Sequence, residues 1–572
     1  MRRHRDKTVL AGIWLAFIAR ALFYCVQQPM WEGYDEWAHF AYIQHIGEHG
    51  TPPSRTSSVS HEVQRSLQLV PLSQSAATGI PGSITHDSFW KLEPEERCRR
   101  EQELRMLSSP AETGDPRAGP TQYEAQQPPL YYLVLTPAYL VTKPLSLPAK
   151  VLVLRILSAA IASSVVFLGY AIASCVLCNR TLAMLVAVLL ACLPGLLIDV
   201  CRIGNESLSI VLTSAVILFS LRVSEPVAGV LDWLMLGTLI GAALLTKAYT
   251  LAFLPLLPLV FVMRILRHRA LKKTMRETTA GCALTFCLTT AIAGWWYWGS
   301  WVTTGTLSGE QLDVAAMRFT LSEKLSSVSG VNWRAVVDCG AFSHVWVGGW
   351  SFLVVRSWMY RVFEFVAAAA AAGVLIYMVR WLRSGRQACS SGVPGHRFVV
   401  VGGAYALMCI AVAYHSLVAH LVRDTSTALG WYLYSVIVPE VVLLALGMSE
   451  LFSTRYASWL VVAVCFFAVA LDLYTVHFML IPYYTGMIAH DSSGSLAGFG
   501  VNLLDSTSAV HRMLRRLAVN ETPAIGEAWI AGLWAAYLST TISLAVAAIV
   551  IAPAKPGAHM DPTARDGGTV RA

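Results

Sequence analysis

Long apolar runs recur along almost the whole chain of 572 residues, and they limit what it can fold into. Each run approaches the roughly 20 residues that a helix needs to cross a bilayer. Charged residues make up only 14% of the chain, against about 25% in an ordinary soluble protein. The sequence therefore predicts an all-α polytopic membrane protein with about twelve transmembrane helices. The predicted spans are Thr8–Met30, Val151–Val176, Leu182–Val200, Ser207–Val223, Val230–Thr246, Leu251–Leu266, Ala280–Trp298, Phe352–Val379, Phe398–Leu421, Tyr432–Leu451, Trp459–Ile481 and Trp529–Ile551.

Basic residues are spread unevenly over the predicted loops, and their distribution predicts the orientation of the chain. The segment Arg2–Lys7 precedes the first span and places the N-terminus in the cytoplasm. Alternation from there puts further basic clusters on the same side. These clusters lie within Arg264–Arg276, within Arg380–Arg397 and in the C-terminal tail. We therefore expect both termini in the cytoplasm, and the net charge of +8 needs no nucleic-acid partner to explain it.

The loops divide the chain into unequal parts. Residues 1–451 are the expected transmembrane core, and residues 31–127 are its long first extracytoplasmic loop, a length that usually indicates function. Pro128–Thr142 is apolar but short, so we expect it to be a juxtamembrane helix. Residues 452–552 should form C-terminal transmembrane helices with one more extracytoplasmic loop, and 553–572 a disordered cytoplasmic tail.

Most of the twelve cysteines fall within or beside predicted spans, where cysteine behaves as a small apolar residue. Cys98 and Cys339 instead fall in predicted extracytoplasmic loops, which leaves a disulfide between them open. No cysteine or histidine spacing suggests zinc.

Two adjacent carboxylates, Asp35 and Glu36, directly follow the first predicted span. Charge at a membrane exit is costly to bury, so the pair suggests chemistry at the membrane surface. A second polar motif, Glu124–Tyr132, closes the same loop. Each has a simpler interpretation when taken alone, because acidic residues also mark helix N-termini and a glutamate before Pro-Pro can merely end a flexible loop.

Several further residues are costly or unusual at the membrane. Arg155 lies inside its predicted span and needs a carboxylate or a lipid headgroup. Lys247 at the edge of its span either has a partner or extends to the interface. Trp295–Trp301 is typical of an interfacial aromatic belt.

Taken in order, these motifs resemble the GT-C superfamily of integral-membrane glycosyltransferases, and in particular bacterial relatives of protein O-mannosyltransferases and lipid A aminoarabinose transferases. The resemblance covers the chain through about Leu451. Three residues depart from the pattern: Gln127 replaces a lysine of the aminoarabinose transferases, Glu206 a shorter aspartate, and Trp431 a common arginine. The matching segments are Tyr34–Tyr42, Glu124–Tyr132, Arg155–Ser158, Asn205-Glu206, Leu245–Lys247, Gly294–Tyr297 and Gly430–Pro439.

The resemblance implies transfer of a sugar from a polyprenyl-phosphate-linked donor to a lipid, glycan or protein acceptor, outside a bacterial plasma membrane. Asp35 is the candidate general base, and Glu36 is its neighbouring acceptor or orienting group. Lys247, Arg155, Arg202 or Arg423 would stabilise the departing phosphate. No redox or phosphoryl cofactor is needed, and a divalent cation stays open because members of the superfamily differ. The expected substrate-binding residues are Glu124, Gln127, Tyr131, Arg155, Arg202, Asn205, Glu206, Lys247, Trp296, Tyr297 and Tyr432.

Two other classes of protein remain alternatives. A transporter or lipid flippase would explain the number of spans and the intramembrane charges, but it predicts related halves, and the sequence shows no internal repeat. A degenerate GT-C-like accessory protein without activity would explain the departures at Gln127, Glu206 and Trp431.

Overall fold

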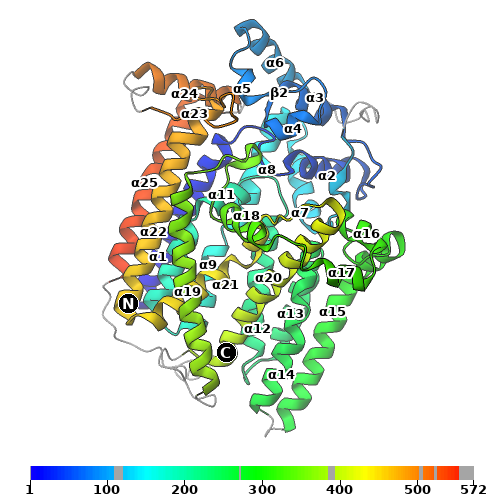
Figure 1. The fold of residues 1–572 in the computed structure, drawn as a ribbon, viewed down its shortest axis with the longest axis vertical. Helices are drawn as coiled ribbons and strands as arrows, with labels where there is room; N and C mark the ends of the chain where they lie inside the picture. Colours follow the sequence, from blue (N-terminus) through cyan, green and yellow to red (C-terminus); the bar gives the residue numbers. More distant parts are fainter. Residues whose placement is uncertain are drawn as a thin grey trace, which may run out of the picture.

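The computed structural model describes residues 2–107, 120–268, 272–383, 393–500, 507–520 and 525–552, and these are helical almost throughout (Figure 1). Its long helices run roughly side by side along the longest axis of the molecule, as a bundle of transmembrane helices would. The predicted tail 553–572, together with Arg269 and Arg386 of the basic clusters, lies outside the described residues.

Each predicted apolar span contains a helix. In the described part of the chain, ten helices are long and apolar enough to cross a membrane, or eleven if one bent pair counts as a single span. The predicted span Val230–Thr246 forms only the shorter helix α13 (Val230–Leu244), which accounts for the difference from twelve. The other helices of the bundle are α1 (Arg2–Gln27), α8 (Leu147–Ala162), α9 (Val165–Leu177), α10 (Arg180–Cys192), α11 (Pro194–Val200), α12 (Glu206–Val223), η2 (Ala248–Phe253), α14 (Leu256–His268), α15 (Lys272–Thr304), α19 (Ser357–Arg383), α20 (Gly395–Arg423), η5 (Gly430–Val436), α21 (Ile437–Leu451), α22 (Thr454–Thr475), η6 (Val476–Leu480), α23 (Ile481–Tyr484) and α25 (Glu527–Ile551).

At least two of the predicted spans contain a break with a local cause. The bent pair is α10 and α11, which meet at an angle of 59° just before Pro194. A proline at the first position of a helix has no N–H to continue the preceding helix, so the chain turns there. Between α8 and α9, Ser163 and Ser164 donate their hydroxyls to backbone carbonyls of the preceding turn, which gives the backbone an alternative to the helical ladder.

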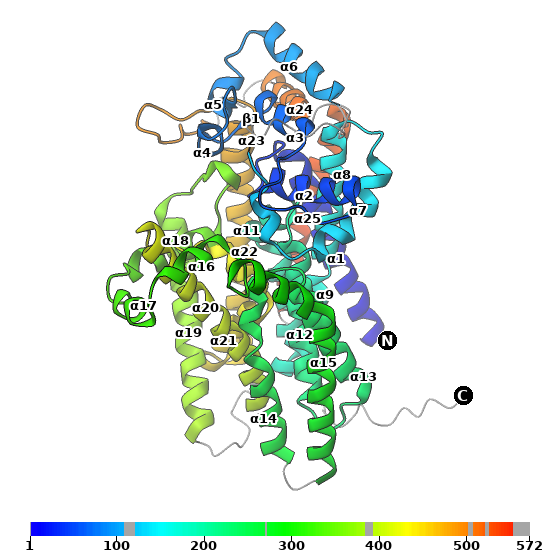
Figure 2. The same cartoon turned by 90° about the vertical axis from the view of Figure 1, so that its right-hand side faces the viewer.

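The remaining elements belong to the loops, and some of them gather at one end of the bundle. Figures 1 and 2 show α3, α4, α5, α6 and α24 together at one end, whereas α14, α15 and α19 reach the opposite end. The elements α16, α17 and α18, from the loop after α15, instead lie about halfway along the molecule, so the loop elements do not form one layer. These elements are α2 (Glu36–His49), α3 (His61–Leu69), β1 (Pro71–Leu72), α4 (Gln74–Thr78), β2 (Ile84–Thr85, parallel to β1), α5 (His86–Phe89), α6 (Pro94–Met106), η1 (Tyr123–Gln126), α7 (Leu130–Thr142), α16 (Gln311–Ala315), η3 (Ala316–Arg318), α17 (Leu321–Ser327), α18 (Trp333–Val345), η4 (Gly349–Ser351) and α24 (Thr507–Asn520).

A fully buried ion pair braces the first helix against the last ones. Arg20 of α1 lies 2.8 Å from the Asp472 carboxylate of α22. Tyr24 and Tyr537 donate hydroxyls to the same carboxylate at 2.5 and 2.6 Å. A buried charge in a bilayer needs such partners, so this contact fixes α1, α22 and α25 to one another.

The disulfide between Cys98 and Cys339, which the sequence left undecided, is not formed. Cys98 lies exposed on α6 and Cys339 half-buried on α18, and both thiols are free. Because the two helices come from different loops, their sequence positions gave no measure of the distance between them.

Candidate active site

Asp35 stands in a strained turn at the start of α2. Its φ of 54° is left-handed, as is the φ of 68° at Trp31, and this region is uncommon for residues other than glycine. The Asp35 carboxylate does not cap α2. It instead accepts a hydrogen bond from the Tyr123 hydroxyl, which η1 presents from the far end of the first loop. The two ends of that loop therefore meet at Asp35, which is half-buried.

Glu36 is buried and fully engaged. Its Oε1 accepts from Arg155 Nε at 2.7 Å and from the Ile203 amide at 3.1 Å. Its Oε2 accepts from a terminal nitrogen of Arg155 at 2.7 Å and from the Trp31 amide at 3.2 Å. A carboxylate has about four lone-pair sites, so Glu36 has none left for a substrate and its geometry fits the orienting role.

The expected phosphate-binding role of Arg155 is corrected by the same geometry. Arg155 is fully buried, and its other terminal nitrogen and remaining N–H groups donate to the carbonyls of Cys25, Gln28 and Pro29. All five donors of a guanidinium are thus used. The sequence could not distinguish this internal pairing from a contact to lipid phosphate.

Two other expected cations do lie beside Asp35. Arg202 is 2.9 Å from both Asp199 and Glu206, and it donates to the Tyr34 carbonyl at 2.8 Å. Lys247 pairs with the other oxygen of Glu206. Glu206 therefore joins the two cations, which stay close together although both are positive.

Two more carboxylates complete the cluster. Glu124 is buried and its Oε2 has no hydrogen-bond partner among the described residues. Glu310, which follows Gly309 in the loop after α15, accepts from the side-chain amides of Gln126 at 2.9 Å and Gln127 at 3.3 Å. Asn205 in turn donates to the Gln127 side-chain oxygen at 3.2 Å, so one polar chain connects three loops.

These charges perturb one another. Burial raises the pKa of Asp35, while the hydrogen bond from Tyr123 and the charges of Arg202 and Lys247 oppose the rise. Burial and the charge of Asp35 raise the pKa of Glu124 well above its usual range. Burial raises the pKa of Glu310 to about 7, and burial next to Arg202 lowers that of Lys247 to about 8. Groups perturbed by both burial and specific charges are typical of functional sites.

Unpaired buried atoms give a second sign of a binding site. Glu124 Oε2, Asp199 Oδ2, Asn205 Oδ1 and Arg202 Nε have no hydrogen-bond partner within the part of the chain that the structure describes. Buried polar atoms are normally paired with protein, water or ligand. These four atoms belong to the cluster around Asp35, so its polar groups have hydrogen-bonding capacity that the other described residues do not use.

The other expected residues have mainly structural contacts. The Tyr131 hydroxyl lies 2.7 Å from that of Ser158 and accepts from the Gly204 amide at 2.9 Å. Tyr297 donates to the Leu244 carbonyl at 2.8 Å, and Trp296 is partly buried against the core. These contacts hold α7 and α15 against neighbouring elements.

Two aromatic residues from η5 lie close to the cluster. Trp431 stacks on Tyr34 with ring centroids 4.1 Å apart, so this residue covers the turn that carries Asp35. The Tyr432 ring lies 5.3 Å from that of His415.

Sequence reasoning missed Tyr123, Asp199 and Glu310. Tyr123 directly precedes the recognised motif at Glu124 and could have been included with it. Asp199 falls inside the predicted span Leu182–Val200, where the apolar residues around it give no sign of a site. Glu310 is one of several acidic residues in its loop, and nothing in the sequence separates it from Asp313 or Glu323.

No group of three or more histidine, cysteine, aspartate or glutamate residues could hold a metal ion within the described ranges. This observation leaves the use of a divalent cation untested.

The fold and the cluster define a polytopic, all-helical membrane protein with a charged site at the end where its loops gather. No protein-family model matches the chain, and no curated protein does so significantly.

Two solved structures are similar to this one. One is ArnT from Cupriavidus metallidurans bound to undecaprenyl phosphate, with 12% sequence identity and a TM-score of 0.44. The match covers 94% of this chain and 77% of that chain. AglB, the oligosaccharyltransferase of Archaeoglobus fulgidus, in complex with an inhibitory peptide and a dolichol-phosphate has 13% identity, 88% and 59% covered, and a TM-score of 0.37.

Proposed function

We propose that this protein transfers a sugar from a polyprenyl-phosphate-linked donor to an acceptor on the extracytoplasmic side of a plasma membrane, with both termini in the cytoplasm. Asp35 acts as the general base that removes the acceptor proton. The observation that carries the proposal is the contrast between two adjacent carboxylates: Arg155 occupies Glu36 completely, whereas Asp35 has the Tyr123 hydroxyl as its one hydrogen-bond partner among the described side chains and faces two cations.

Sugar transfer from a phosphate donor needs a carboxylate and cations close together. As the bond to the donor phosphate breaks, the anomeric carbon gains positive charge and the phosphate gains negative charge. A carboxylate beside the anomeric carbon stabilises its positive charge and takes the proton from the acceptor hydroxyl. Lys247 and Arg202 stabilise the negative charge on the departing phosphate, because charge-assisted hydrogen bonds to phosphate are strong in a site with little water.

The flanking groups orient the reactants. Glu124 and Glu310 lie within electrostatic reach of Asp35 or Lys247 and bind acceptor hydroxyls. The lipid tail of the donor stays in the bilayer beside the apolar faces of the spans, so its phosphate reaches the loop end of the bundle. The acceptor is a lipid, a glycan or a protein.

The test is transfer by purified protein from a panel of radiolabelled polyprenyl-phosphate sugars, with release of the phosphate-lipid as the signal. Asp35→Asn should lower the rate by ~10²–10⁴-fold, the usual contribution of a general base. Asp35→Glu should recover little, since a displacement of about 1 Å can cost ~10²-fold.

Asp424→Asn is the matched control. Asp424 also has a left-handed φ, 55°, and its side chain is 95% exposed at the end of α20. It should keep the wild-type rate. Normal turnover in Asp35→Asn would remove Asp35 from the mechanism, and Glu124 would become the next candidate.

A further inference from the structure

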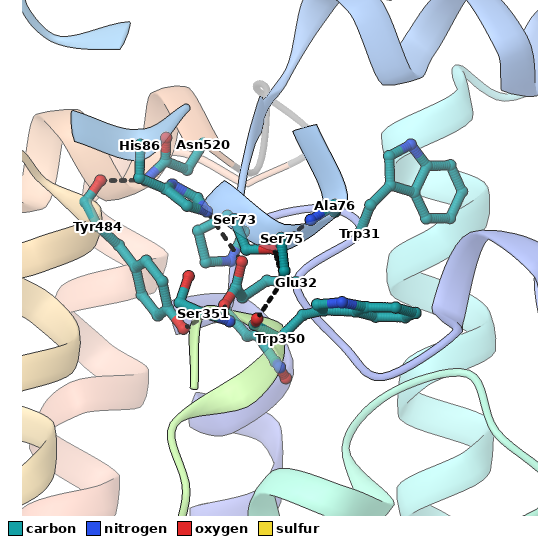
Figure 3. A network of polar contacts seen from close by, with 12 residues as sticks. Trp31, Glu32, Ser73, Ser75, Ala76, His86, Trp350, Ser351, Tyr484 and Asn520 are labelled. Carbon is teal, nitrogen blue, oxygen red and sulfur yellow. Dashed lines mark hydrogen bonds and ion pairs between the residues drawn. The ribbon is translucent and has the colours of Figure 1, made fainter. Parts of the chain in front are cut away.

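A second buried polar cluster centres on Glu32, three residues before Asp35 (Figure 3). The Glu32 side chain is 1% exposed. Its Oε2 accepts from His86 Nε2 at 2.9 Å. Its Oε1 accepts from the Ser351 amide at 2.6 Å and from the Tyr484 hydroxyl at 3.2 Å. One carboxylate thus has three donors from three separate elements.

These donors come from distant parts of the chain. His86 belongs to α5 in the first loop, Ser351 to η4 in a later loop, and Tyr484 to α23 in the C-terminal helices. Tyr484 is 452 residues from Glu32 along the sequence. Figure 3 shows these three residues around Glu32, each from a different ribbon. The C-terminal region, which carries none of the recognised motifs, is therefore connected directly to the turn before Asp35.

The backbone around Glu32 is built for this contact. The Glu32 carbonyl accepts from the Trp350 amide at 2.8 Å. Gly349 has a left-handed φ of 60°, and a Cβ there would lie 3.0 Å from both the carbonyl oxygen and Oε1 of Glu32. Only glycine meets both conditions without strain.

The turn that this cluster holds is strained at two positions, Trp31 and Asp35. Strained conformations persist only when their surroundings fix them. Arg155 fixes Glu36 on one side of Asp35, and the partners of Glu32 fix the other side. Asp35 has only Tyr123 to hold its own carboxylate among the described side chains.

We propose that Glu32 is a positioning residue: by joining α5, η4 and α23 it holds the left-handed turn that presents Asp35 to the substrate. The inference rests on the proposed function for the role of Asp35. The hold on the turn itself can be measured without any substrate.

The decisive pair of variants is Glu32→Ala and Glu32→Gln. Alanine removes all three hydrogen bonds. Glutamine can keep the bonds from Ser351 and Tyr484, because its oxygen accepts from both. Its amide can donate to His86 Nε2 only if the imidazole takes the other tautomer, which leaves a buried Nδ1–H without a partner among the described residues. If Glu32 works by geometry, glutamine should restore what alanine loses.

The first readout is hydrogen exchange of the Trp350 and Ser351 amides and of the first turn of α2. We expect Glu32→Ala to lose protection at these amides and Glu32→Gln to keep it. The second readout is sugar transfer. Glu32→Ala should lower kcat by ~10²-fold with the donor KM little changed, since a displaced base costs rate rather than donor binding.

Tyr484→Phe tests the C-terminal connection alone and should give a smaller loss of kcat. Tyr474→Phe on α22 is its control, because the Tyr474 ring stacks on Phe478 and is not among the three donors to Glu32 described above. Glu48→Gln is the control for a carboxylate on α2, since Glu48 binds Tyr139 and Lys143 at the other end of that helix.

Unchanged protection in Glu32→Ala would overturn the proposal. So would lost protection with an unchanged kcat, because Glu32 would then stabilise the loops without positioning Asp35. A wild-type protein that transfers no sugar from any donor would reject the proposed function, and the exchange readout alone would then decide whether Glu32 holds the turn.

Discussion

Asp35 and Glu36 have opposite surroundings although one peptide bond separates them. Glu36 forms a fully buried pair with Arg155, whereas burial raises the pKa of Asp35, so the charge of Asp35 is held at a cost. A buried charge without a strong partner lowers the stability of the fold, and such a residue is more typical of a functional site than of a structural contact.

Glu36→Gln should therefore destabilise the protein, while Asp35→Asn should not. Removing one partner of a buried ion pair leaves the other uncompensated, which typically costs about 3–5 kcal/mol. Thermal unfolding in detergent measures both variants. Equal melting temperatures for Glu36→Gln and wild type would contradict the pairing with Arg155.

Lys247 should set the alkaline limit of transfer. Its pKa is lowered to about 8 by burial and Arg202, so its positive charge is lost as the pH rises through that value and the departing phosphate loses a cation. The rate should fall above about pH 8. Lys247→Arg keeps its charge in this range and should move the fall to higher pH. If the rate of Lys247→Arg falls at the same pH as that of the wild type, another group causes the fall.

Only part of this site could be predicted from the sequence. Asp35, Glu124 and Lys247 could be, since charge beside apolar runs is visible in any sequence. The pairing of Arg155 and the arrival of Glu310 could not, because they depend on which loops meet in space. Sequence spacing carries no information on that.

At the scale of helices, α19 and α21 pack with their backbones in close contact. A Cβ on Gly373 would meet the backbone of Gly447, and one on Gly447 would meet that of Ala370. Small residues are what allow two membrane helices to approach so closely.

Gly447→Ala should therefore force α19 and α21 apart. Overpacking of this kind typically costs about 1–3 kcal/mol. The control is Gly532→Ala on α25, where an added Cβ would meet nothing within 4 Å. Thermal unfolding of the two variants should show a loss for the first only.

Hydropathy predicted every span but not the breaks within them. The chain is apolar on both sides of Ser163 and of Pro194, so hydropathy averaged along the sequence shows no break at either residue. The breaks depend on serine hydroxyls that bond to the backbone and on a missing N–H, which are local features.

For the whole molecule, the predicted orientation can be tested with the protein's own thiols. Cys98 is exposed on α6 at the loop end, so an impermeant maleimide should label it in intact cells. A cysteine introduced as Arg276→Cys at the other end of the bundle should react only after permeabilisation. Labelling of that site from outside would reverse the orientation and move the site to the cytoplasm.

The ion pair between Arg20 and Asp472 also sets an order of events during synthesis. Its partners are 452 residues apart, which at about 5–20 residues per second corresponds to roughly 20–90 s of translation. Until α22 emerges, the guanidinium has only the carbonyls of Ala191 and Cys192 at the end of α10 as acceptors among these contacts. A ribosome that stops before Asp472 therefore leaves a membrane protein whose first helix carries a positive charge without its carboxylate.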